Sequence, residues 1–499
     1  MIDNLHLERI PDILQFNPGT PMVFSSGLFL IIFFLFLLVY NILSKHKNAR
    51  LGILIIFSIY FYYKSAGYLA SILVISAFVN FYFGKFIGIN KEPWIRKLLF
   101  ILSIIVNIGI LAYFKYTNFI IEIINGIQNS QIEPFNIFLP IGISFYTFKS
   151  MNYIFDVYLE TMKPTGSFRD FCVFVFFFPN ILAGPIDRAS KFLPQVNAEP
   201  FLSKEDLGKA IFLIILGLIK KVMIADYIGL NFVDRIFDFP LRFTGFENLI
   251  ATYGYTLQIY CDFSGYSDLA IGIALLMGFK LMDNFNAPFK ATSVADFWRR
   301  WHISLSSWLL DYLFRPLQMK FRRLRTFSNV NGLFITFLLC GLWHGAGWNF
   351  IIWGTLHGIY MSISLLLKKP RTFIYKKLGI YNTKILKFAQ GFITFHLIAF
   401  SFLIFRIPNF ETIKEVLSQI FTFFHGGILE QFLEKMPLIS GLLIVGYIFH
   451  FTPIKVEEWL KKAISNMPLI LKAFLLAAVI WLVYQFQSAD MQPFIYFQF

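Results

Sequence analysis

The stretch GLWHGAGWNF, residues 341–350, holds a single titratable side chain, His344, among three glycines and two tryptophans. Strongly apolar segments flank it on both sides. Apolar segments that enter a membrane normally exclude ionisable groups, because an unsatisfied polar side chain in hydrocarbon is energetically costly. An ionisable residue that persists there marks a functional site by default. The stretch therefore predicts two membrane-embedded segments that part at a glycine-rich turn, with His344 as a candidate functional residue.

The composition of the whole chain agrees with a membrane location. Of the 499 residues, 57% are hydrophobic and 19% are aromatic, and the mean hydropathy is +0.64. A soluble protein of this length needs more polar surface, so we expect an all-α polytopic membrane protein surrounded by membrane lipid. The net charge of +15 does not indicate nucleic acid as a partner. The lysines and arginines lie in short loops between apolar runs, a distribution that indicates which loops are on the cytoplasmic side of a membrane.

Twelve apolar runs are long enough to span or nearly span a membrane, since about 20 helical residues cross the hydrocarbon. They lie near residues 23–43, 51–63, 66–84, 97–119, 136–158, 207–230, 247–279, 329–343, 346–367, 386–405, 437–452 and 469–486. With the N-terminus outside, all the basic clusters between these runs fall on the cytoplasmic side, as the positive-inside rule requires. The loop at 120–135, which contains no lysine or arginine, then faces out.

Three further segments fit this scheme only as re-entrant or surface elements. Residues 171–186 are apolar but interrupted by proline and glycine, and residues 302–318 lie between two basic segments. Both are candidates for lining a cavity, because irregular backbone at membrane depth needs shielding by protein or water. Residues 411–426 are predicted to form an amphipathic helix on the outer face.

The domain organisation is predicted to be simple. No soluble domain, linker or internal repeat is visible, so residues 22–499 are expected to form one membrane domain. Residues 1–21 contain charges and prolines and lack a small-residue cleavage site, which favours a surface extension over a signal peptide. Met22 is a plausible alternative start. The three cysteines are widely spaced in apolar surroundings and support neither a disulfide framework nor a zinc site.

A second histidine lies in the segment DFWRRWHISLSSW, residues 296–308. On a helix, Trp301 and the two other tryptophans of this segment share a face, and Arg299 lies one turn from His302. An aromatic belt with basic anchors at the membrane interface accounts for the tryptophans. It explains less well why a histidine and three serines enter an apolar segment, so we favour a functional role for His302.

The glycines around His344 let a substrate or another backbone approach closely, because glycine has no side chain. The alternative is a packed histidine bonded to a carbonyl. His357 follows thirteen residues later, a rotation of about 220° on a helix, so the two imidazoles do not share a face. A metal site formed by these two histidines is therefore not expected, and the chain contains neither an HExxH motif nor a cysteine cluster.

The run CDFSGYSD, residues 261–268, places two carboxylates inside an apolar segment. Asp262 and Asp268 need partners there, which nearby arginines could supply. Structural ion pairing and cavity lining are both compatible with this pattern.

Histidine titrates near neutrality, so it can take a proton from a hydroxyl group while the oxygen attacks a thioester or ester. The chain shows no nucleophile elbow, P-loop or dinucleotide-binding fingerprint. Direct acyl transfer, with the acceptor hydroxyl as nucleophile and histidine as base, fits this inventory.

With these motifs the chain resembles the membrane-bound O-acyltransferase (MBOAT) family, and in particular its bacterial alginate O-acetyltransferase branch. The resemblance covers roughly residues 22–499. It rests on PIGISFYTF (140–148), FPNILAGP (178–185), CDFSGYSDLAIG (261–272), DFWRRWHISLSSW (296–308), GLWHGAGWNFIIWG (341–354) with the His357-Gly358 pair, and the terminal PFIYFQF (493–499).

The resemblance implies a ring of about 11–13 tilted transmembrane helices, with re-entrant segments, around a central tunnel. It also implies that His344 matches the catalytic histidine of the family and His302 its second histidine. Acetyl-CoA is the expected co-substrate and would reach the tunnel from the cytoplasm, with no bound cofactor and no metal. The residues expected to line the tunnel or contact substrate are Trp343, Asn349, Trp301, Arg299, Arg300, Ser304, Asp262 and Tyr266.

The chain departs from the branch at two places. After Pro316 the branch typically has a Gly-Gly-Asn-Arg turn, where this chain has LQMKFRR, and Asp187 follows Gly-Pro-Ile where an apolar residue is common. No periplasmic esterase-like domain is fused to the chain, so a separate periplasmic partner is expected.

The predicted protein is an acyltransferase of the bacterial inner membrane that O-acetylates an exported polysaccharide, as in alginate-type acetylation. Peptidoglycan O-acetylation and D-alanyl transfer from a carrier protein are the alternatives within the same chemistry. A transporter is the alternative from another class, but the inverted repeats typical of transporters are not found.

Overall fold

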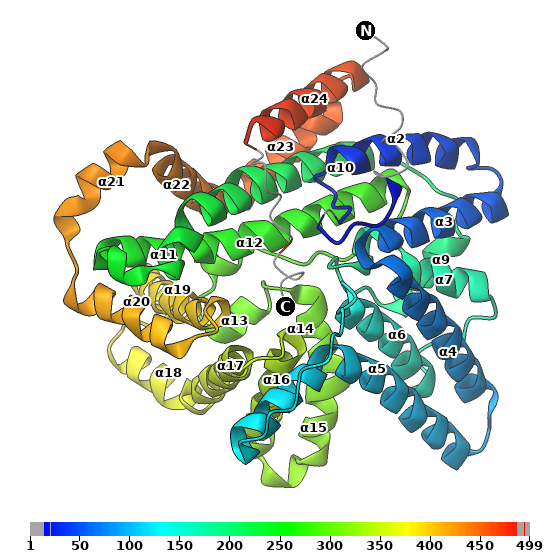
Figure 1. Ribbon diagram of the computed structural model, residues 1–499, viewed down its shortest axis with the longest axis horizontal. Helices are drawn as coiled ribbons and strands as arrows, with labels where there is room; N and C mark the ends of the chain where they lie inside the picture. Colours follow the sequence, from blue (N-terminus) through cyan, green and yellow to red (C-terminus); the bar gives the residue numbers. More distant parts are fainter. Residues whose placement is uncertain (1–13, 20, 487–493, 495–499) are drawn as a thin grey trace. The chain divides into compact units, whose positions relative to one another are not determined.

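The computed structural model describes residues 14–19, 21–486 and 494. The predicted surface extension at 1–21 therefore lies mostly outside the described residues. The chain divides into two compact units, one formed by residues 1–210 and 269–281 and the other by residues 211–268 and 282–499. Throughout the described ranges the regular elements are helical, as predicted for an all-α protein (Figure 1).

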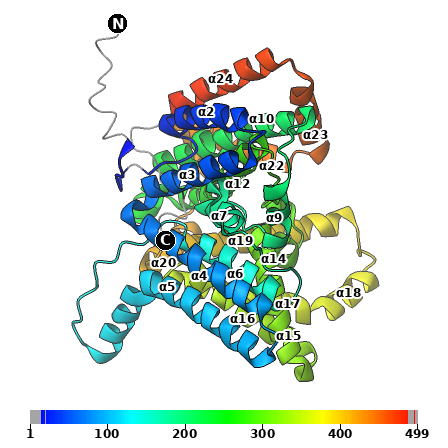
Figure 2. The same ribbon diagram turned by 90° about the vertical axis from the view of Figure 1, so that its right-hand side faces the viewer.

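The first unit is built from helices that follow one another along the chain. In it, α4, α5 and α6 pack against one another, and α7 packs against α3 and α9 (Figures 1 and 2). Its helices are α2 (Gly27–Ile42), α3 (Lys47–Ala66), α4 (Ala70–Ile89), α5 (Pro93–Gln128), α6 (Ile143–Tyr158), α7 (Phe168–Phe176), α8 (Phe178–Ile181), α9 (Ala189–Asn197) and the start of α10 (Lys204–Leu218).

The second unit contains both histidine segments. Its helices are η3 (Ile219–Asp226), η4 (Gly229–Val233), α11 (Asp234–Asp238), most of α12 (Gly245–Leu276), α13 (Val294–Trp298), α14 (Ile303–Leu309), η7 (Leu310–Phe314), α15 (Arg315–Lys320), α16 (Thr326–His344), α17 (Trp348–Leu366), α18 (Lys368–Lys377), α19 (Lys384–Arg406), α20 (Phe410–Thr422), α21 (Leu429–Lys435), α22 (Pro437–Phe451), α23 (Ile454–Asn466) and α24 (Leu469–Phe486).

Every predicted apolar run falls on a helix, but fewer helices than runs qualify as full spans. Within the described residues, seven helices are long and apolar enough to cross a membrane, and α21 with α22 forms a further pair bent by 104°. Two predicted spans, 51–63 and 66–84, belong to one helical run from Lys47 to Ile89 that is interrupted at Gly67. Helices α2 and α6 have only 16 residues each, or about 24 Å of helix, short of the roughly 30 Å hydrocarbon core.

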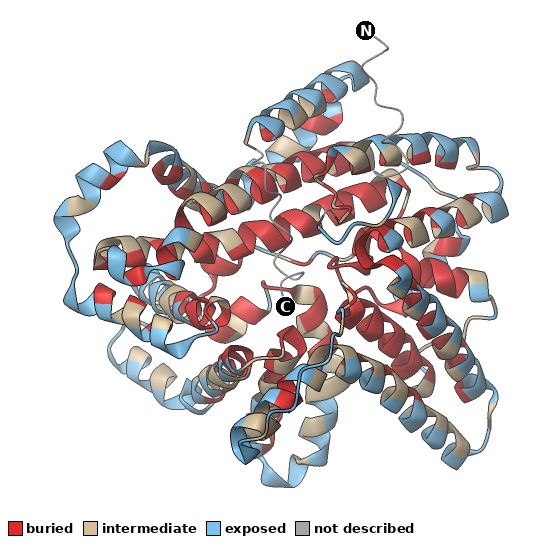
Figure 3. Cartoon of the chain, in the orientation of Figure 1, coloured by how far each residue is buried: buried red, intermediate tan, exposed pale blue. Residues whose placement is uncertain are grey.

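Burial differs sharply among the candidate spans. The apolar window of α12 is 89% buried, whereas those of α5 and α24 are 17% and 11% buried (Figure 3). Apolar side chains exposed along such helices are what a protein surrounded by lipid presents to the membrane. The chain is thus an integral membrane protein whose helix α12 is enclosed by protein.

The segments predicted to be re-entrant or amphipathic are short helices. In the run 171–186, α7 ends before Phe177 and α8 follows, and the side chains there are buried, which is the shielding that a broken backbone needs. The run 302–318 is divided among α14, η7 and α15. Helix α20 buries Ile413 and Val416 on one face, as predicted for an amphipathic helix.

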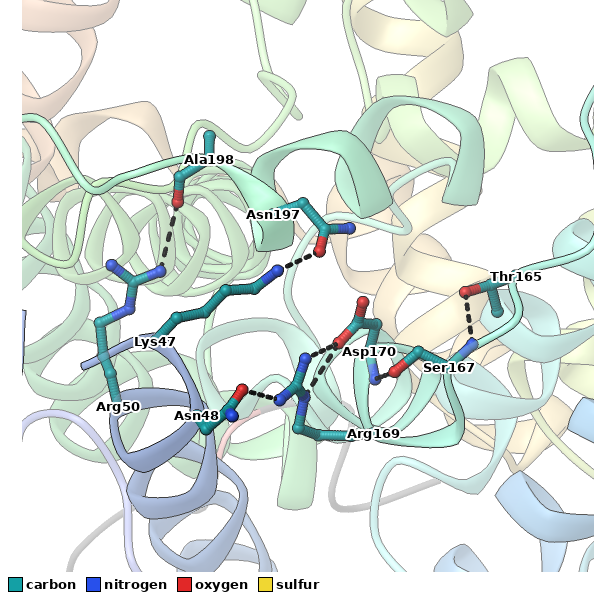
Figure 4. Close-up of polar contacts among 9 residues, drawn as sticks. All are labelled: Lys47, Asn48, Arg50, Thr165, Ser167, Arg169, Asp170, Asn197 and Ala198. Atoms are coloured by element: carbon teal, nitrogen blue, oxygen red, sulfur yellow. Dashed lines mark hydrogen bonds and ion pairs between the residues drawn. The ribbon is translucent and has the colours of Figure 1, made fainter. Parts of the chain in front are cut away.

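Two basic clusters that the positive-inside rule assigns to the same side meet in the first unit (Figure 4). Lys47 Nζ at the start of α3 donates to Asn197 Oδ1 at 2.5 Å, and Arg50 donates to the carbonyl of Ala198 at 3.2 Å. Arg169 at the start of α7 donates to Asp170 Oδ1 and to Asn48 Oδ1. These bonds fasten the beginning of α3 to α7 and to the end of α9.

Helices α16 and α17 form the hairpin that contains His344, and they lie side by side along their length (Figures 1 and 2). Glycine makes their close approach possible. A Cβ atom on Gly341 would meet the carbonyl oxygen of Phe350 and lie 3.1 Å from Gly354 Cα, and one on Gly354 would lie 3.0 Å from Gly341 Cα. Of the two explanations for these glycines, substrate or backbone approach, the structure supports backbone approach at Gly341.

Candidate active site

His344 is the last residue of α16 and is 3% exposed. Three aromatic rings surround its imidazole edge-on, at centroid distances of 5.0 Å for Trp343, 5.0 Å for Trp353 and 5.4 Å for Phe405. These rings come from α16, α17 and α19. Asn349 Nδ2 donates to the carbonyl of Phe405 at 3.0 Å and so ties the start of α17 to α19 beside the imidazole.

His302 precedes α14 and is fully buried. Its Nδ1 lies 3.2 Å from Asn284 Oδ1, which also accepts hydrogen bonds from the backbone N–H and the hydroxyl of Ser304, at 3.2 and 2.8 Å. A backbone N–H can only donate, so the shared atom must be the amide oxygen. His302 therefore carries its proton on Nδ1, and its Nε2 is the basic nitrogen.

The indole of Trp343 connects the two histidines. Its ring centroid lies 5.0 Å from the His344 ring and 6.1 Å from the His302 ring. Two segments that are separate in the sequence, the residue before α14 and the end of α16, thus lie beside one buried aromatic side chain. The two histidines singled out from the sequence have their rings next to the same indole.

Comparison with known proteins now gives the family. The family model described as MBOAT, membrane-bound O-acyltransferase, matches residues 163–405, which include both histidines. The chain is 34% identical to a probable alginate O-acetylase of Pseudomonas putida, covering 96% of this chain and 100% of that protein. The chain belongs to the MBOAT family.

Other relatives are named for transfer to other acceptors. A peptidoglycan O-acetyltransferase of Helicobacter pylori is 35% identical, with 73% of this chain and 72% of that protein covered. A teichoic acid D-alanyltransferase of Bacillus subtilis is 32% identical, with 56% of this chain and 71% of that protein covered. Each relative is named for transferring an acyl group, and this MBOAT chain is accordingly a membrane-bound acyltransferase.

His357, the third histidine of this region, is bonded as a structural residue. Its Nδ1 accepts a hydrogen bond from Trp298 Nε1 at 3.2 Å, and its Nε2 lies 3.1 Å from Ser401 Oγ. Because an indole nitrogen only donates, the His357 proton is on Nε2 and is directed to Ser401. Among the described residues no group of three or more histidines, cysteines or carboxylates is placed to hold a metal ion.

The residues that were expected to line a tunnel differ in how close they lie to the histidines. Ser304 shares Asn284 with His302, and Trp301 stacks on Phe297 at 5.5 Å and contacts Phe402 at 5.1 Å. Arg299 is exposed. Arg300 pairs with Asp296 at 3.1 Å and lines a cavity of about 360 Å³ whose lining includes neither histidine.

The carboxylates of α12 have lysine partners instead of the arginines that the sequence suggested. Lys220 Nζ lies 2.7 Å from Asp268 Oδ2. Lys221 Nζ lies 2.7 Å from Asp226 Oδ1 and is also bonded to Asp262. The signal for these partners was present in the sequence, because two lysines inside the apolar run 207–230 are themselves expected to be paired. For Asp262, the structure supports ion pairing.

Tyr266 belongs to an aromatic contact that involves the C-terminal motif. Its ring stacks on Phe494 at 4.7 Å, and Phe494 also contacts Phe263 at 5.7 Å. Phe263 in turn lies edge-on to the imidazole of His302 at 4.6 Å. Phe494 is the one residue of the terminal PFIYFQF motif that the structure describes, and Phe263 alone lies between its ring and the imidazole of His302.

Proposed function

We propose that this protein transfers an acyl group, in the simplest case acetyl, from a cytoplasmic thioester to hydroxyl groups of an exported polysaccharide, and that it does so in the bacterial inner membrane. The observation that supports the site is the convergence of His344 and His302 on the indole of Trp343. The similarity over 96% of the chain to a probable alginate O-acetylase supports the reaction.

In the proposed reaction His344 is the general base. It takes the proton of the acceptor hydroxyl while that oxygen attacks the thioester carbonyl, so that the C–O bond forms and a tetrahedral intermediate results. The intermediate collapses by breaking its C–S bond, and protonated His344 returns the proton to the departing thiolate. The products are the ester and the free thiol, and no metal or redox cofactor takes part.

His302 is proposed to orient the donor or to assist the proton transfer. Asn284 accepts its Nδ1 proton, which makes Nε2 the unprotonated nitrogen of the ring. Such preorganised groups are most effective in a site without bulk water. Ser304, held by the same Asn284 oxygen, completes this arrangement.

The buried position of His344 bears on how the substrates reach it. At 3% exposure, the imidazole is accessible only if one of its aromatic neighbours moves. Exclusion of water in the resting state suits a thioester enzyme, because it limits hydrolysis of the activated acyl group. We propose that binding of donor or acceptor displaces Trp343, the ring shared with His302.

The proposed donor, acceptor and partner rest on the chemistry of acyl transfer and on similarity to the named relatives. Acetyl-CoA is the proposed donor, and a separate periplasmic acetyltransferase or esterase-like protein is the proposed partner for the final transfer. Peptidoglycan acetylation and D-alanyl transfer are the competing acceptor and donor assignments, because relatives with these names match the chain at 35% and 32% identity.

The test compares O-acyl groups on secreted glycans, peptidoglycan and teichoic acid by NMR in the producing strain. One strain lacks the gene for this protein. In three further strains the deletion is complemented with the gene for the wild type, His344→Ala or His425→Ala. Loss of a general base lowers the rate about 10²- to 10⁴-fold, so His344→Ala should leave the glycan unmodified. His425, an exposed histidine bonded to a local carbonyl, is the matched control and should complement fully.

Equal membrane levels of the variants are required for this comparison. Full acetylation with His344→Ala would refute the role of this histidine. Acyl groups lost only from peptidoglycan, or D-alanine lost from teichoic acid, would replace the proposed acceptor.

A further inference from the structure

The second unit contains an apolar groove of about 590 Å³, and neither His302 nor His344 is among the residues that line it. It lies between α19 and α22, with α12 contributing one side chain. Aromatic rings form most of its wall, namely Phe388, Phe392, Phe395, Tyr447, Phe451, Tyr253 and Phe289. Gly391 is part of the same wall and leaves room for an occupant, because the nearest heavy atom to a Cβ placed there is 3.8 Å away.

The groove continues into a basic pocket of about 360 Å³. The two share Lys290, Thr292 and Lys387, so their walls are contiguous. Five cationic side chains line the basic pocket: Lys290, Arg300, Lys368, Arg371 and Lys387. Asp296 is the one acidic residue in that lining, and its carboxylate is paired with Arg300 at 3.1 Å.

The positive charges of the pocket are not balanced by the described side chains that line it. Lys290 Nζ is bonded to an uncharged acceptor, the carbonyl of Thr452, at 2.6 Å. Burial, and then the nearby charge of Arg300, lower the pKa of Lys290, against a smaller opposing effect of Glu457. Bringing an anion into this pocket therefore relieves repulsion between neighbouring cations.

Part of the groove wall belongs to a helix that is apolar enough to cross a membrane. Helix α19 is one of the candidate spans, and its side chains Phe388 and Phe392 are 76% and 56% exposed. Large apolar side chains exposed on a membrane-spanning helix contact lipid chains. The basic pocket lies next to α18, a short helix rich in lysine that the positive-inside rule assigns to the cytoplasmic surface.

We propose that this composite cavity binds an anionic glycerophospholipid of the cytoplasmic leaflet, with one acyl chain in the aromatic groove and the phosphate in the basic pocket. Basic pockets between transmembrane helices on the cytoplasmic side are suited to anionic headgroups. A soluble phosphate leaves the aromatic groove empty, and the acetyl group of a short-chain thioester is too small to fill it. The proposal does not depend on the proposed acetylation function.

The test measures lipid binding to the purified full-length protein by native mass spectrometry, after detergent exchange and titration with phosphatidylglycerol or phosphatidylcholine. Wild type should retain phosphatidylglycerol in preference to phosphatidylcholine. The double variant Lys368→Gln/Arg371→Gln removes two headgroup contacts. Each basic residue near an anionic surface contributes roughly 1 kcal/mol. The double variant should therefore bind phosphatidylglycerol about 30-fold more weakly than wild type.

Two matched variants separate a built site from general surface charge. Lys376→Gln/Lys377→Gln removes the same charge from the same helix but outside the lining, and it should bind like wild type. Gly391→Phe fills the groove and should reduce binding, whereas Gly391→Ala, with only ordinary contacts, should not. Elution as a single monodisperse species is required of each variant.

Equal weakening of binding in the two double variants, Lys368→Gln/Arg371→Gln and Lys376→Gln/Lys377→Gln, would overturn the proposal in favour of nonspecific attraction. Displacement of phosphatidylglycerol by inorganic phosphate or acetyl-CoA at comparable concentrations would overturn it in favour of a soluble anion. Retention of lipid by both Lys368→Gln/Arg371→Gln and Gly391→Phe would show that the lipid binds elsewhere.

Discussion

His302 adopts a left-handed backbone conformation, with φ 44° and ψ 53°. This region is uncommon for residues with a side chain, and its cost, of order 1–3 kcal/mol, is tolerated where the surroundings enforce it. Asn284 enforces it here: the carbonyl of Asn284 accepts from the N–H of Ile303, and its side-chain oxygen accepts from Ser304 and His302. We therefore regard Asn284 as a positioning residue for His302.

Replacing Asn284 tests this role through the pH dependence of acyl transfer. Burial lowers the pKa of His302, which lies outside the candidate spans, to about 3, so the ring is neutral at working pH. Asn284→Asp keeps the acceptor oxygen but adds a negative charge, which favours the charged imidazole and raises its pKa. If neutral His302 is needed, the acid limb of the activity profile moves to higher pH.

The measurement is the pH–rate profile of acyl transfer in membrane vesicles for wild type, Asn284→Asp and Asn284→Ala. Asn284→Ala leaves buried donors unsatisfied and should destabilise the protein by about 1–3 kcal/mol. A profile for Asn284→Asp that scales down uniformly, without a shift of its acid limb, would indicate a purely structural role.

At the residue scale, the two histidines could be predicted from the sequence, but Asn284, which positions His302, could not. His302 and His344 could be selected because ionisable residues in apolar segments are costly. Asn284 could not, because its neighbourhood, DNFN, looks like an ordinary polar loop. Its role arises only when the chain returns to place Ser304 and His302 against the Asn284 oxygen.

At the scale of elements, the α16–α17 hairpin holds His344 by backbone contact between glycines. A Cβ atom on Gly354 would meet the carbonyl oxygen of Phe337 and the backbone of Gly341, neither of which can move without displacing the helix. In the sequence Gly341 was equally compatible with room for a substrate, because a missing side chain does not reveal what occupies its space. The packing of the two helices resolves that ambiguity at Gly341.

We expect Gly354→Ala to destabilise the protein by about 1–3 kcal/mol, the usual cost of overpacking a filled interior. Gly109→Ala in α5 is the matched control: it is also a glycine within a candidate span, and a Cβ there meets nothing within 4 Å. The melting temperature in detergent, followed by fluorescence-detected gel filtration, should fall for Gly354→Ala and stay level or rise for Gly109→Ala. Equal melting temperatures would contradict the hairpin interpretation.

At the scale of the whole molecule, the sequence predicted where helices lie better than it predicted how many of them are complete membrane spans. The hydrophobic runs predicted every described helix that is long and apolar enough to cross a membrane, because apolar length is visible in the sequence. The separation of complete spans from shorter helices was not visible, since it depends on where helices such as α2 and α6 end. Likewise, the lysine partners of α12 are set by tertiary packing between η3 and α12.

The sidedness of the molecule follows from its charge distribution and has a direct test. The loop at 120–135 has no basic residue and should lie outside, whereas the lysine-rich α18 should lie in the cytoplasm. Gln131 and Lys376 are exposed positions in these two segments. The three native cysteines are buried, so a cysteine introduced at either position can be labelled selectively.

In intact spheroplasts, a membrane-impermeant maleimide should label Gln131→Cys and should label Lys376→Cys only after lysis. Wild type, with its buried cysteines, provides the background. The pattern matters beyond topology, because a cytoplasmic α18 is required both for the proposed anionic lipid pocket and for delivery of the thioester from the cytoplasm. Labelling of Lys376→Cys before lysis would show that the protein has the opposite orientation in the membrane. Both proposals would then have to be reassigned to the opposite face.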